Sequence, residues 1–282
     1  MPSPILRRLA LATLTVALLV APGGGAVAVD EPLAAADRYS PPSLELALAS
    51  LYADSTPAAT PGAIAAAGDD AWSTAKLRLP ACEIKDIPTR FGKVKHWKRT
   101  LLDTNLTLKR SYQPWDLVSV SRAGISGSGK VRKIMIDDLR ALADAARRAG
   151  KPLAVRSAHR TYAYQAALFS SYVRRSGYAQ AIKFSARPGH SEHQLGTTVD
   201  FTTAAGVPLR TSFGASPSGK WLARNGWKYG FIMSYPEGKK KVSCYGYEPW
   251  HWRYFGRALA RKIHESGQVP RRYLYENFEA RP

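Results

Sequence analysis

The sequence predicts one α+β domain over residues 81–282, behind an N-terminal leader. Hydrophobic residues make up 45% and aromatic residues 10% of the 282 positions, so the chain can fill a core and is not a disordered protein. Helical and strand patterns follow one another from about residue 80 onward, without an internal repeat. Because there are only two cysteines, a disulfide-dense miniprotein and a cysteine-built zinc finger are excluded, and any metal is expected to be held by histidine and carboxylate.

The first 28 residues have the organisation of a secretion signal. Arg7 and Arg8 form a basic start, residues 9–20 are almost wholly apolar, and a small-residue segment at 26–28 predicts cleavage after Ala28. The alternative is that this segment is kept as an N-terminal anchor. No apolar run reaches the roughly 20 residues that cross a bilayer. We therefore predict a secreted or cell-wall-associated protein, with no integral membrane span once the signal is removed.

Residues 29–80 are expected to form an Ala- and Pro-rich leader or linker that contains one short helix at 44–52. The domain then begins with a turn that feeds a strand at 117–120. A helical period predicts a helix over 131–148, whose apolar positions are Ile134, Leu139, Leu142, Ala143 and Ala146. A short buried strand and a second helix are predicted next, at 153–155 and 162–172.

Residues with catalytic potential concentrate in three short segments, at 157–162, 188–201 and 248–254. The second and third contain His193, Asp200 and His251, which offer two imidazoles and one carboxylate and leave a fourth position for water, as in catalytic zinc sites. Taken singly, each has an ordinary alternative: a solvated loop histidine, a cap or turn carboxylate, and a core histidine among aromatic residues. His190 precedes His193 by three residues and is an alternative ligand.

These segments resemble the VanY-type D-alanyl-D-alanine carboxypeptidases, which are zinc peptidases of the M15 class. The similarity lies in Ser-Ala-His-Arg-Thr-Tyr at 157–162 followed by Gln165, in Ser-x-His-x6-Asp at 191–200, and in Glu-x-x-His at 248–251. It extends over about residues 101–254. The family more often has Tyr, Ser and Leu-Ala where this chain has His159, Thr161 and Thr197-Thr198, which puts substrate preference in question rather than catalysis.

The resemblance implies a fold and a set of residue roles. The fold is a small, mainly antiparallel sheet with flanking helices, as in Hedgehog and DD-peptidase domains. Zn²⁺ would be the cofactor, and Arg160 would polarise the scissile carbonyl or its oxyanion. Gln165 and Ser191 would lie near the substrate. The resemblance implies that the zinc ligands are His193, Asp200 and His251 and that the general acid/base is Glu248.

The implied activity is removal of the C-terminal D-alanine from peptidoglycan stem peptides. Zinc held by two neutral histidines and one carboxylate lowers the pKa of its water to roughly 7, and a single carboxylate can take that proton and later give one to the leaving amine. Three alternatives stay open: an L,D-carboxypeptidase, a peptidoglycan endopeptidase, and a non-catalytic zinc-binding wall module.

Glu248 and Arg160 each have an alternative, purely structural role. On a straight strand Glu248 and His251 would point to opposite faces, but Pro249 between them favours a bend that lets both face one ion. Glu248 could instead form a surface ion pair, with Arg253 or Arg257. Arg160 could cap the end of its strand by pairing with one of two acidic residues, Glu192 or Asp200.

The formal net charge is +20, and it would be +18 after the signal is removed. This charge and the exposed-looking run Lys239-Lys240-Lys241 suggest attraction to anionic polymers of a bacterial wall, although such a run is also ordinary in a solvated turn. Nonspecific nucleic-acid binding is a weak alternative, because no nucleic-acid motif accompanies the charge. Cys82 and Cys244, the only thiols of a chain predicted to be secreted, are expected to form a disulfide, with two buried free thiols as the alternative.

Overall fold

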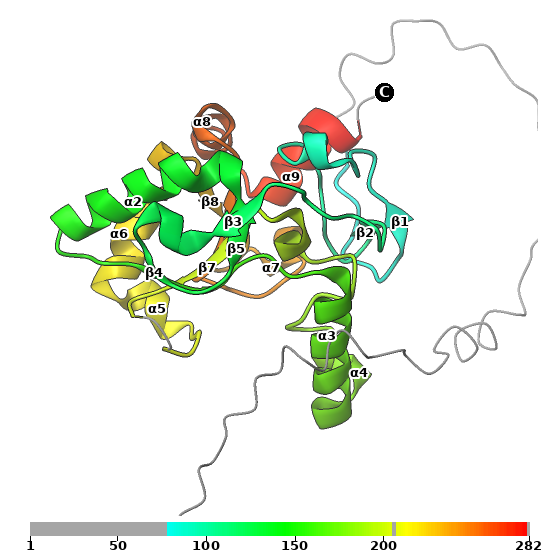
Figure 1. Cartoon of the computed structure of the whole chain (residues 1–282). Coiled ribbons are helices and arrows are strands. Elements are labelled where there is room, and N and C mark those ends of the chain that lie inside the picture. The colour runs from blue at the N-terminus through cyan, green and yellow to red at the C-terminus, as the bar shows by residue number, and fades with distance from the viewer. Residues whose placement is uncertain (1–77, 205–206, 281–282) are drawn as a thin grey trace, which may run out of the picture.

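The computed structural model describes residues 78–204 and 207–280 (Figure 1). The predicted signal at 1–28 and nearly all of the predicted leader, including its helix at 44–52, lie outside the described residues. Among the described helices, none has the length and apolar character needed to cross a membrane.

A five-stranded sheet forms the centre of the domain, with the order β4-β6-β7-β9-β8. In that order its strands are Ser126–Gly127, Ala154–Ser157, Thr198–Thr202, His251–Tyr254 and Phe231–Met233. Only β4 and β6 pair in parallel, and the other three pairings are antiparallel. This confirms the predicted α+β fold with a small, mainly antiparallel sheet.

Two smaller sheets and a set of helices surround it. β1 (Ile87–Pro88) pairs in parallel with β2 (Leu106–Thr107), and β3 (Leu117–Ser119) pairs antiparallel with β5 (Lys130–Arg132). The helices are α2 (Ile136–Arg148), α3 (Tyr162–Ser176), α4 (Tyr178–Ala181), α5 (Ser212–Ala215), α6 (Pro217–Asn225), α7 (Lys240–Ser243), α8 (Arg257–Glu265) and α9 (Pro270–Leu274). Helix α3 extends away from the sheet together with α4 (Figure 1).

Side-chain alternation gives the central sheet one apolar and one polar face. Val199 and Phe201 of β7, with Trp252 and Tyr254 of β9, are buried in the main core, which also contains the apolar side of α2. Because neighbouring residues on a strand point to opposite faces, the residues between these four must face away from α2. Asp200 is one of them, so the site described below lies on the face opposite the helix.

Helix α2 begins later than the period of the sequence predicts. Val131 belongs to β5, where it pairs with Val118 of β3 and is fully buried. Ile134 lies in a 3₁₀ turn and is 43% exposed, and the α-helix starts at Ile136. The helical spacing of apolar residues extends upstream of Ile136, but there the pairing of β5 with β3 determines the backbone conformation. The strands predicted at 117–120 and 153–155 and the helix predicted at 162–172 correspond to β3, β6 and α3, with small shifts at their ends.

The two ends of the described chain are fastened to each other and to the loop before β9. A disulfide joins Cys82 to Cys244, which confirms the predicted bond. Arg271 of α9 forms a buried ion pair with Asp103 at 2.6 Å and donates to the carbonyl oxygens of Pro80 and Val242. The first described residues therefore lie beside α9 (Figure 1).

Candidate active site

Strands β7 and β9 place two of the predicted metal ligands side by side. Asp200 and His251 are direct cross-strand partners in the antiparallel ladder, on the polar face of the sheet. Asp200 Oδ1 lies 3.4 Å from His251 Nδ1, and the side chains are almost wholly buried. The register of β7 and β9 alone thus places Asp200 beside His251.

His193 reaches the same point from a 3₁₀ turn over Glu192–Leu195. The turn ends at Gly196, which has a φ of +71°, and a second glycine with positive φ, Gly189 at +86°, lies three residues before the turn. A Cβ on Gly196 would lie only 3.0 Å from side-chain atoms of Arg132 and Leu117, so this close approach requires glycine. His193 Nδ1 lies 2.6 Å from the carbonyl oxygen of Ala158, which directs the other ring nitrogen toward Asp200.

His193, Asp200 and His251 bring their ligand atoms within 4.8 Å of one another, and all three are buried. Within the described ranges, His193 Nε2 and Asp200 Oδ1 are buried atoms without a hydrogen-bond partner. Buried polar atoms are rarely left unpaired, and two imidazole nitrogens with a carboxylate oxygen are the donor set of a catalytic zinc site. These residues therefore fit the zinc ion that the resemblance to the VanY-type carboxypeptidases implies.

Glu248 adds a second carboxylate beside this group. It precedes β9, and the backbone NH of His251 donates to the Glu248 carbonyl oxygen at 3.0 Å in the turn that contains Pro249. Glu248 Oε2 lies 3.6 Å from His251 Nδ1, which confirms that the two side chains converge. The alternative of a surface ion pair is wrong, because Arg253 pairs with Glu192 and Arg257 pairs with Asp138.

Arg160, between β6 and α3, lies on the other side of Asp200. Its guanidinium donates to Ser157 Oγ at 3.0 Å, to Gln165 Oε1 at 2.9 Å and to Ser191 Oγ at 3.5 Å. The guanidinium also lies 3.8 Å from Asp200 Oδ2. Of the two acidic partners considered for Arg160, Asp200 therefore makes a long contact and Glu192 makes none. The predicted substrate residues Gln165 and Ser191 are thus both neighbours of Arg160.

His190, the alternative ligand, is held elsewhere. Its ring nitrogens lie 2.8 Å from the carbonyl oxygen of Asp103 and 2.7 Å from Asp86 Oδ1. The structure therefore brings His193, and not His190, to Asp200.

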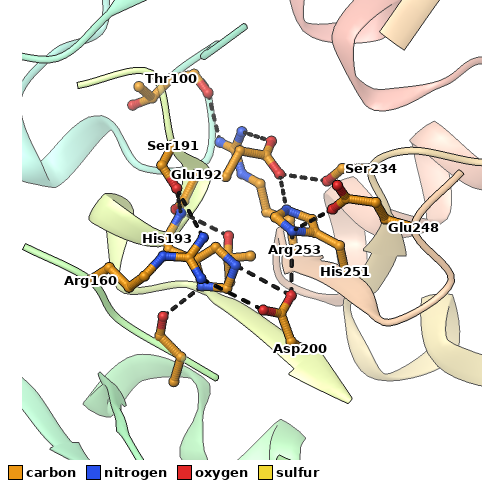
Figure 2. A network of polar contacts seen from close by, with 12 residues as sticks. Thr100, Arg160, Ser191, Glu192, His193, Asp200, Ser234, Glu248, His251 and Arg253 are labelled. Carbon is orange, nitrogen blue, oxygen red and sulfur yellow. Dashed lines mark hydrogen bonds and ion pairs between the residues drawn. The ribbon is translucent and has the colours of Figure 1, made fainter. Parts of the chain in front are cut away.

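Sequence reasoning did not identify the role of Glu192, which lies between Ser191 and His193. Glu192 Oε2 lies 2.9 Å from His251 Nε2 and accepts from Ser234 Oγ at 2.6 Å, while Oε1 accepts from Arg253 at 2.9 Å (Figure 2). One sequence signal was available. His251 and Arg253 are two residues apart among aromatic residues on one strand, so they share a face and predict a polar network on it.

The three candidate ligands differ in their electrostatic environment. Burial and the nearby Arg160 lower the pKa of His193 to about 4, so its imidazole is neutral, the form that binds metals. Burial opposes ionisation of Asp200, but the two histidines hold its pKa below the usual value. Burial also disfavours the proton on His251, but its contacts with the Asp200 and Glu192 carboxylates outweigh this effect and raise its pKa to about 10. The carboxylates therefore stabilise positive charge at this position.

The Glu192 side chain is 4% exposed and that of Glu248 is 18% exposed, and their electrostatic environments differ. Burial raises the pKa of Glu192, but Arg253 and two hydrogen bonds overcome it and lower the pKa to about 2. For Glu248, burial is the largest influence and raises the pKa to about 7, with His251 opposing it. A carboxyl group of this kind can both accept and release a proton near neutral pH. The Glu192 carboxyl group, by comparison, is ionised at neutral pH.

A cleft of about 380 Å³ opens over the site, and the candidate residues Arg160, Gln165, Ser191 and Glu248 line it. Aromatic side chains form much of the remaining wall: Tyr172, Phe184, Tyr235, Tyr245, Tyr247 and Trp250. Lys183 also contributes to the lining. The cleft thus combines an apolar surface with a few convergent polar groups, as small-molecule and peptide sites do.

Comparison with known proteins identifies relatives of the domain. A family model described as VanY, D-alanyl-D-alanine carboxypeptidase, matches residues 128–257. The chain is 36% identical over 180 residues to the protein of Bacillus subtilis (strain 168) named "Putative carboxypeptidase YodJ", covering 62% of this chain and 66% of that protein. It is 33% identical over 183 residues to the D-alanyl-D-alanine carboxypeptidase of Enterococcus faecalis, covering 57% and 66%. The chain thus spans just under two thirds of the length of these relatives.

Solved structures with the same fold include two peptidases. The LdcB LD-carboxypeptidase superposes with a TM-score of 0.59 at 30% identity, covering 69% of this chain and 98% of that one. A mutant of the vancomycin resistance D,D-pentapeptidase VanY, in complex with Zn(II), superposes with a TM-score of 0.54 at 29% identity, covering 63% and 99%.

Proposed function

Because the chain belongs to the family of VanY-type D-alanyl-D-alanine carboxypeptidases, we propose that it is a secreted zinc metallopeptidase that removes the C-terminal D-alanine from peptidoglycan stem peptides. The observation that carries the proposal is the convergence of His193, Asp200 and His251, with their ligand atoms within 4.8 Å, beside the carboxylate of Glu248. Three protein ligands with a fourth position for water are typical of catalytic zinc sites, and a nearby carboxylate can serve as general acid/base.

His193 Nε2, Asp200 Oδ1 and His251 Nδ1 would hold the zinc ion, because the other ring nitrogens of the two histidines are engaged by Ala158 and Glu192. When bound, zinc would act as a Lewis acid and supply a water that is nucleophilic at neutral pH. Glu248 takes the proton from the attacking water and returns it to the departing amine. A carboxyl group that lies 3.6 Å from a candidate ligand and faces the cleft is suited to both transfers.

Arg160 stabilises the negative charge that develops on the carbonyl oxygen. Its side chain is held by Gln165 and Ser157, so the guanidinium is oriented before the substrate binds. Ser191 and Gln165 recognise the terminal carboxylate. The Ser191 oxygen accepts hydrogen bonds and keeps its own hydrogen to donate, and the Gln165 amide uses one hydrogen on the carbonyl oxygen of Ala186 and keeps the other.

An L,D-carboxypeptidase is the second candidate, and a specific observation favours it. The LdcB LD-carboxypeptidase covers more of this chain than the VanY D,D-pentapeptidase does, with a higher TM-score. Both activities use the same reaction and differ in the configuration of the residue before the scissile bond. Secretion, and attraction of the basic chain with its exposed Lys239–Lys241 segment to anionic wall polymers, are parts of the proposal that rest on the sequence.

The test is mass spectrometry of defined stem peptides incubated with the purified protein. We expect a pentapeptide ending in D-Ala-D-Ala to lose one alanine, the same peptide with a C-terminal amide to remain intact, and a chelator to abolish the reaction until zinc is restored. The amidated peptide should not be cleaved, because the protein donors that would bind the terminal carboxylate then have no charged acceptor.

Each other outcome identifies a different enzyme. Cleavage of a tetrapeptide in preference to the pentapeptide would replace the D,D-activity by the L,D-activity. Equal turnover of the acid and the amide would contradict a carboxypeptidase and indicate an endopeptidase. No cleavage of any peptide by a zinc-loaded protein would leave a zinc-binding wall module.

A further inference from the structure

Glu192 is a buried carboxylate that does not face the substrate cleft. Its side chain is 4% exposed, and it is not among the residues that line the cleft. Its two oxygens are instead bonded to three side chains, His251, Ser234 and Arg253, at 2.6–2.9 Å. The network is drawn in Figure 2. A carboxylate in this position cannot exchange protons with a substrate, so its function must be exerted through the groups that it contacts.

The bond from Glu192 determines which ring nitrogen His251 presents to the site. Glu192 Oε2 lies 2.9 Å from His251 Nε2, so only Nδ1 faces Asp200 and Glu248. Without this bond the imidazole could turn about its side-chain torsions or flip its ring, because β9 fixes the backbone but not the ring. A carboxylate on the far nitrogen of a metal-binding histidine fixes the tautomer and raises the basicity of the ligand.

Arg253 keeps Glu192 charged and in place. It projects from the same face of β9 as His251, two residues further on, and is fully buried. One nitrogen donates to Glu192 Oε1 at 2.9 Å, and another donates to the carbonyl oxygens of Trp97 and Thr100 at 2.8 and 2.7 Å. The planar guanidinium contacts these partners together, so Arg253 links the turn at 97–100 to the candidate metal site.

We propose that Glu192 and Arg253 are a pair of positioning residues that hold His251 with Nδ1 toward the metal. Neither contacts the substrate. Their effect is on zinc affinity and on the geometry of the ligand set, whichever peptide bond the enzyme cuts. The inference rests on the proposed function only in that the three candidate ligands bind zinc.

The experiment compares Glu192→Gln with Asp103→Asn, a matched control in another buried pair. Asp103 is also a buried carboxylate paired to an arginine, Arg271, which likewise donates to two carbonyl oxygens. An amide offers a single carbonyl oxygen, so in Glu192→Gln either His251 or Arg253 faces an NH₂ group. We expect both variants to be less stable to urea, but only Glu192→Gln to lose zinc affinity, by about 10- to 100-fold in competition with a chelator.

A second readout is the visible absorption of the protein loaded with Co²⁺, which reports ligand geometry. It should change in Glu192→Gln and not in Asp103→Asn. Unchanged zinc affinity and an unchanged spectrum in Glu192→Gln would overturn the inference and leave a purely structural ion pair. If the parent protein itself binds no zinc, the proposed function fails, and the inference with it.

Ser234→Ala keeps the test decisive if Glu192→Gln does not fold. It removes the 2.6 Å hydrogen bond to Glu192 Oε2 and leaves both charges of the pair intact. A hydrogen bond from a neutral donor to a charged acceptor stabilises the position of that acceptor, so its loss should lower zinc affinity by about three- to tenfold. Affinity equal to that of the parent would overturn the inference.

Discussion

The disulfide between Cys82 and Cys244 is expected to contribute a large share of the stability of the domain. It joins two positions separated by 162 residues. In the chain-entropy treatment, closing a loop of this length restricts the unfolded chain by an amount worth about 5 kcal/mol at 25 °C, and removal of native disulfides typically costs 2–5 kcal/mol. The loss of stability on removing this disulfide should therefore be comparable to the whole free energy of unfolding of many domains.

The clean perturbation is Cys82→Ser, because Cys82 is exposed and the buried position 244 keeps its native side chain. We expect the free energy of unfolding to fall by about 2–5 kcal/mol in urea titrations followed by tryptophan fluorescence, at one fixed zinc concentration. Activity per folded molecule should persist, because the loop before β9 is also held by buried Tyr245 and by the bond from Glu248 NH to the Tyr235 carbonyl oxygen.

A reductant provides the control. It should lower the stability of the parent protein to that of Cys82→Ser and leave the variant unchanged, since only the parent has a bond to reduce. Intact mass after alkylation without reductant should show no label on the parent. If the parent and Cys82→Ser unfold within about 1 kcal/mol of each other, the loop-closure reasoning is refuted.

The remaining predictions concern the candidate active site. His193→Ala, Asp200→Ala and His251→Ala should each lose most of an expected single zinc per chain, measured by elemental analysis, and full occupancy in His251→Ala would contradict the ligand set. Glu248→Gln should keep its zinc and lose at least about 10²-fold in kcat, whereas retained activity would exclude it as the general acid/base. Arg160→Lys should lower kcat more than it raises KM, because an ammonium does not reproduce the planar guanidinium, and a change confined to KM would assign Arg160 to ground-state carboxylate binding.

Glu192 and Glu248 show how two nearby carboxylates acquire different properties. Glu192 is paired with Arg253 and hydrogen-bonded on both oxygens, and its pKa is lowered to about 2. Glu248 has no arginine at ion-pair distance within the described residues, and burial raises its pKa to about 7. If Glu248→Gln retained activity, Glu192 would therefore not be its replacement, because its oxygens are occupied and it lies outside the cleft.

Local patterns in the sequence were sufficient for the fold class and for the three segments that supply the candidate site. The period of α2, the β-branched run of β7 and the Pro249 bend each depend on residues close together in the chain. For the same reason the sequence predicted the convergence of Glu248 and His251, which are three residues apart. It misplaced the start of α2, because the pairing of β5 with the distant β3 overrides a period that continues through Ile134.

Only the tertiary structure decided which of the nearby polar residues reach the site. His193 was the predicted ligand and His190 the alternative. In the structure Asp86 and Asp103 hold His190, while Ala158 orients His193. The sequence likewise did not identify Glu192 as a member of this network, since its partners lie 42–61 positions away in the chain. Side-chain hydrogen bonds act over about 3 Å in space and carry no period along the sequence, so the fold alone determines which of them form.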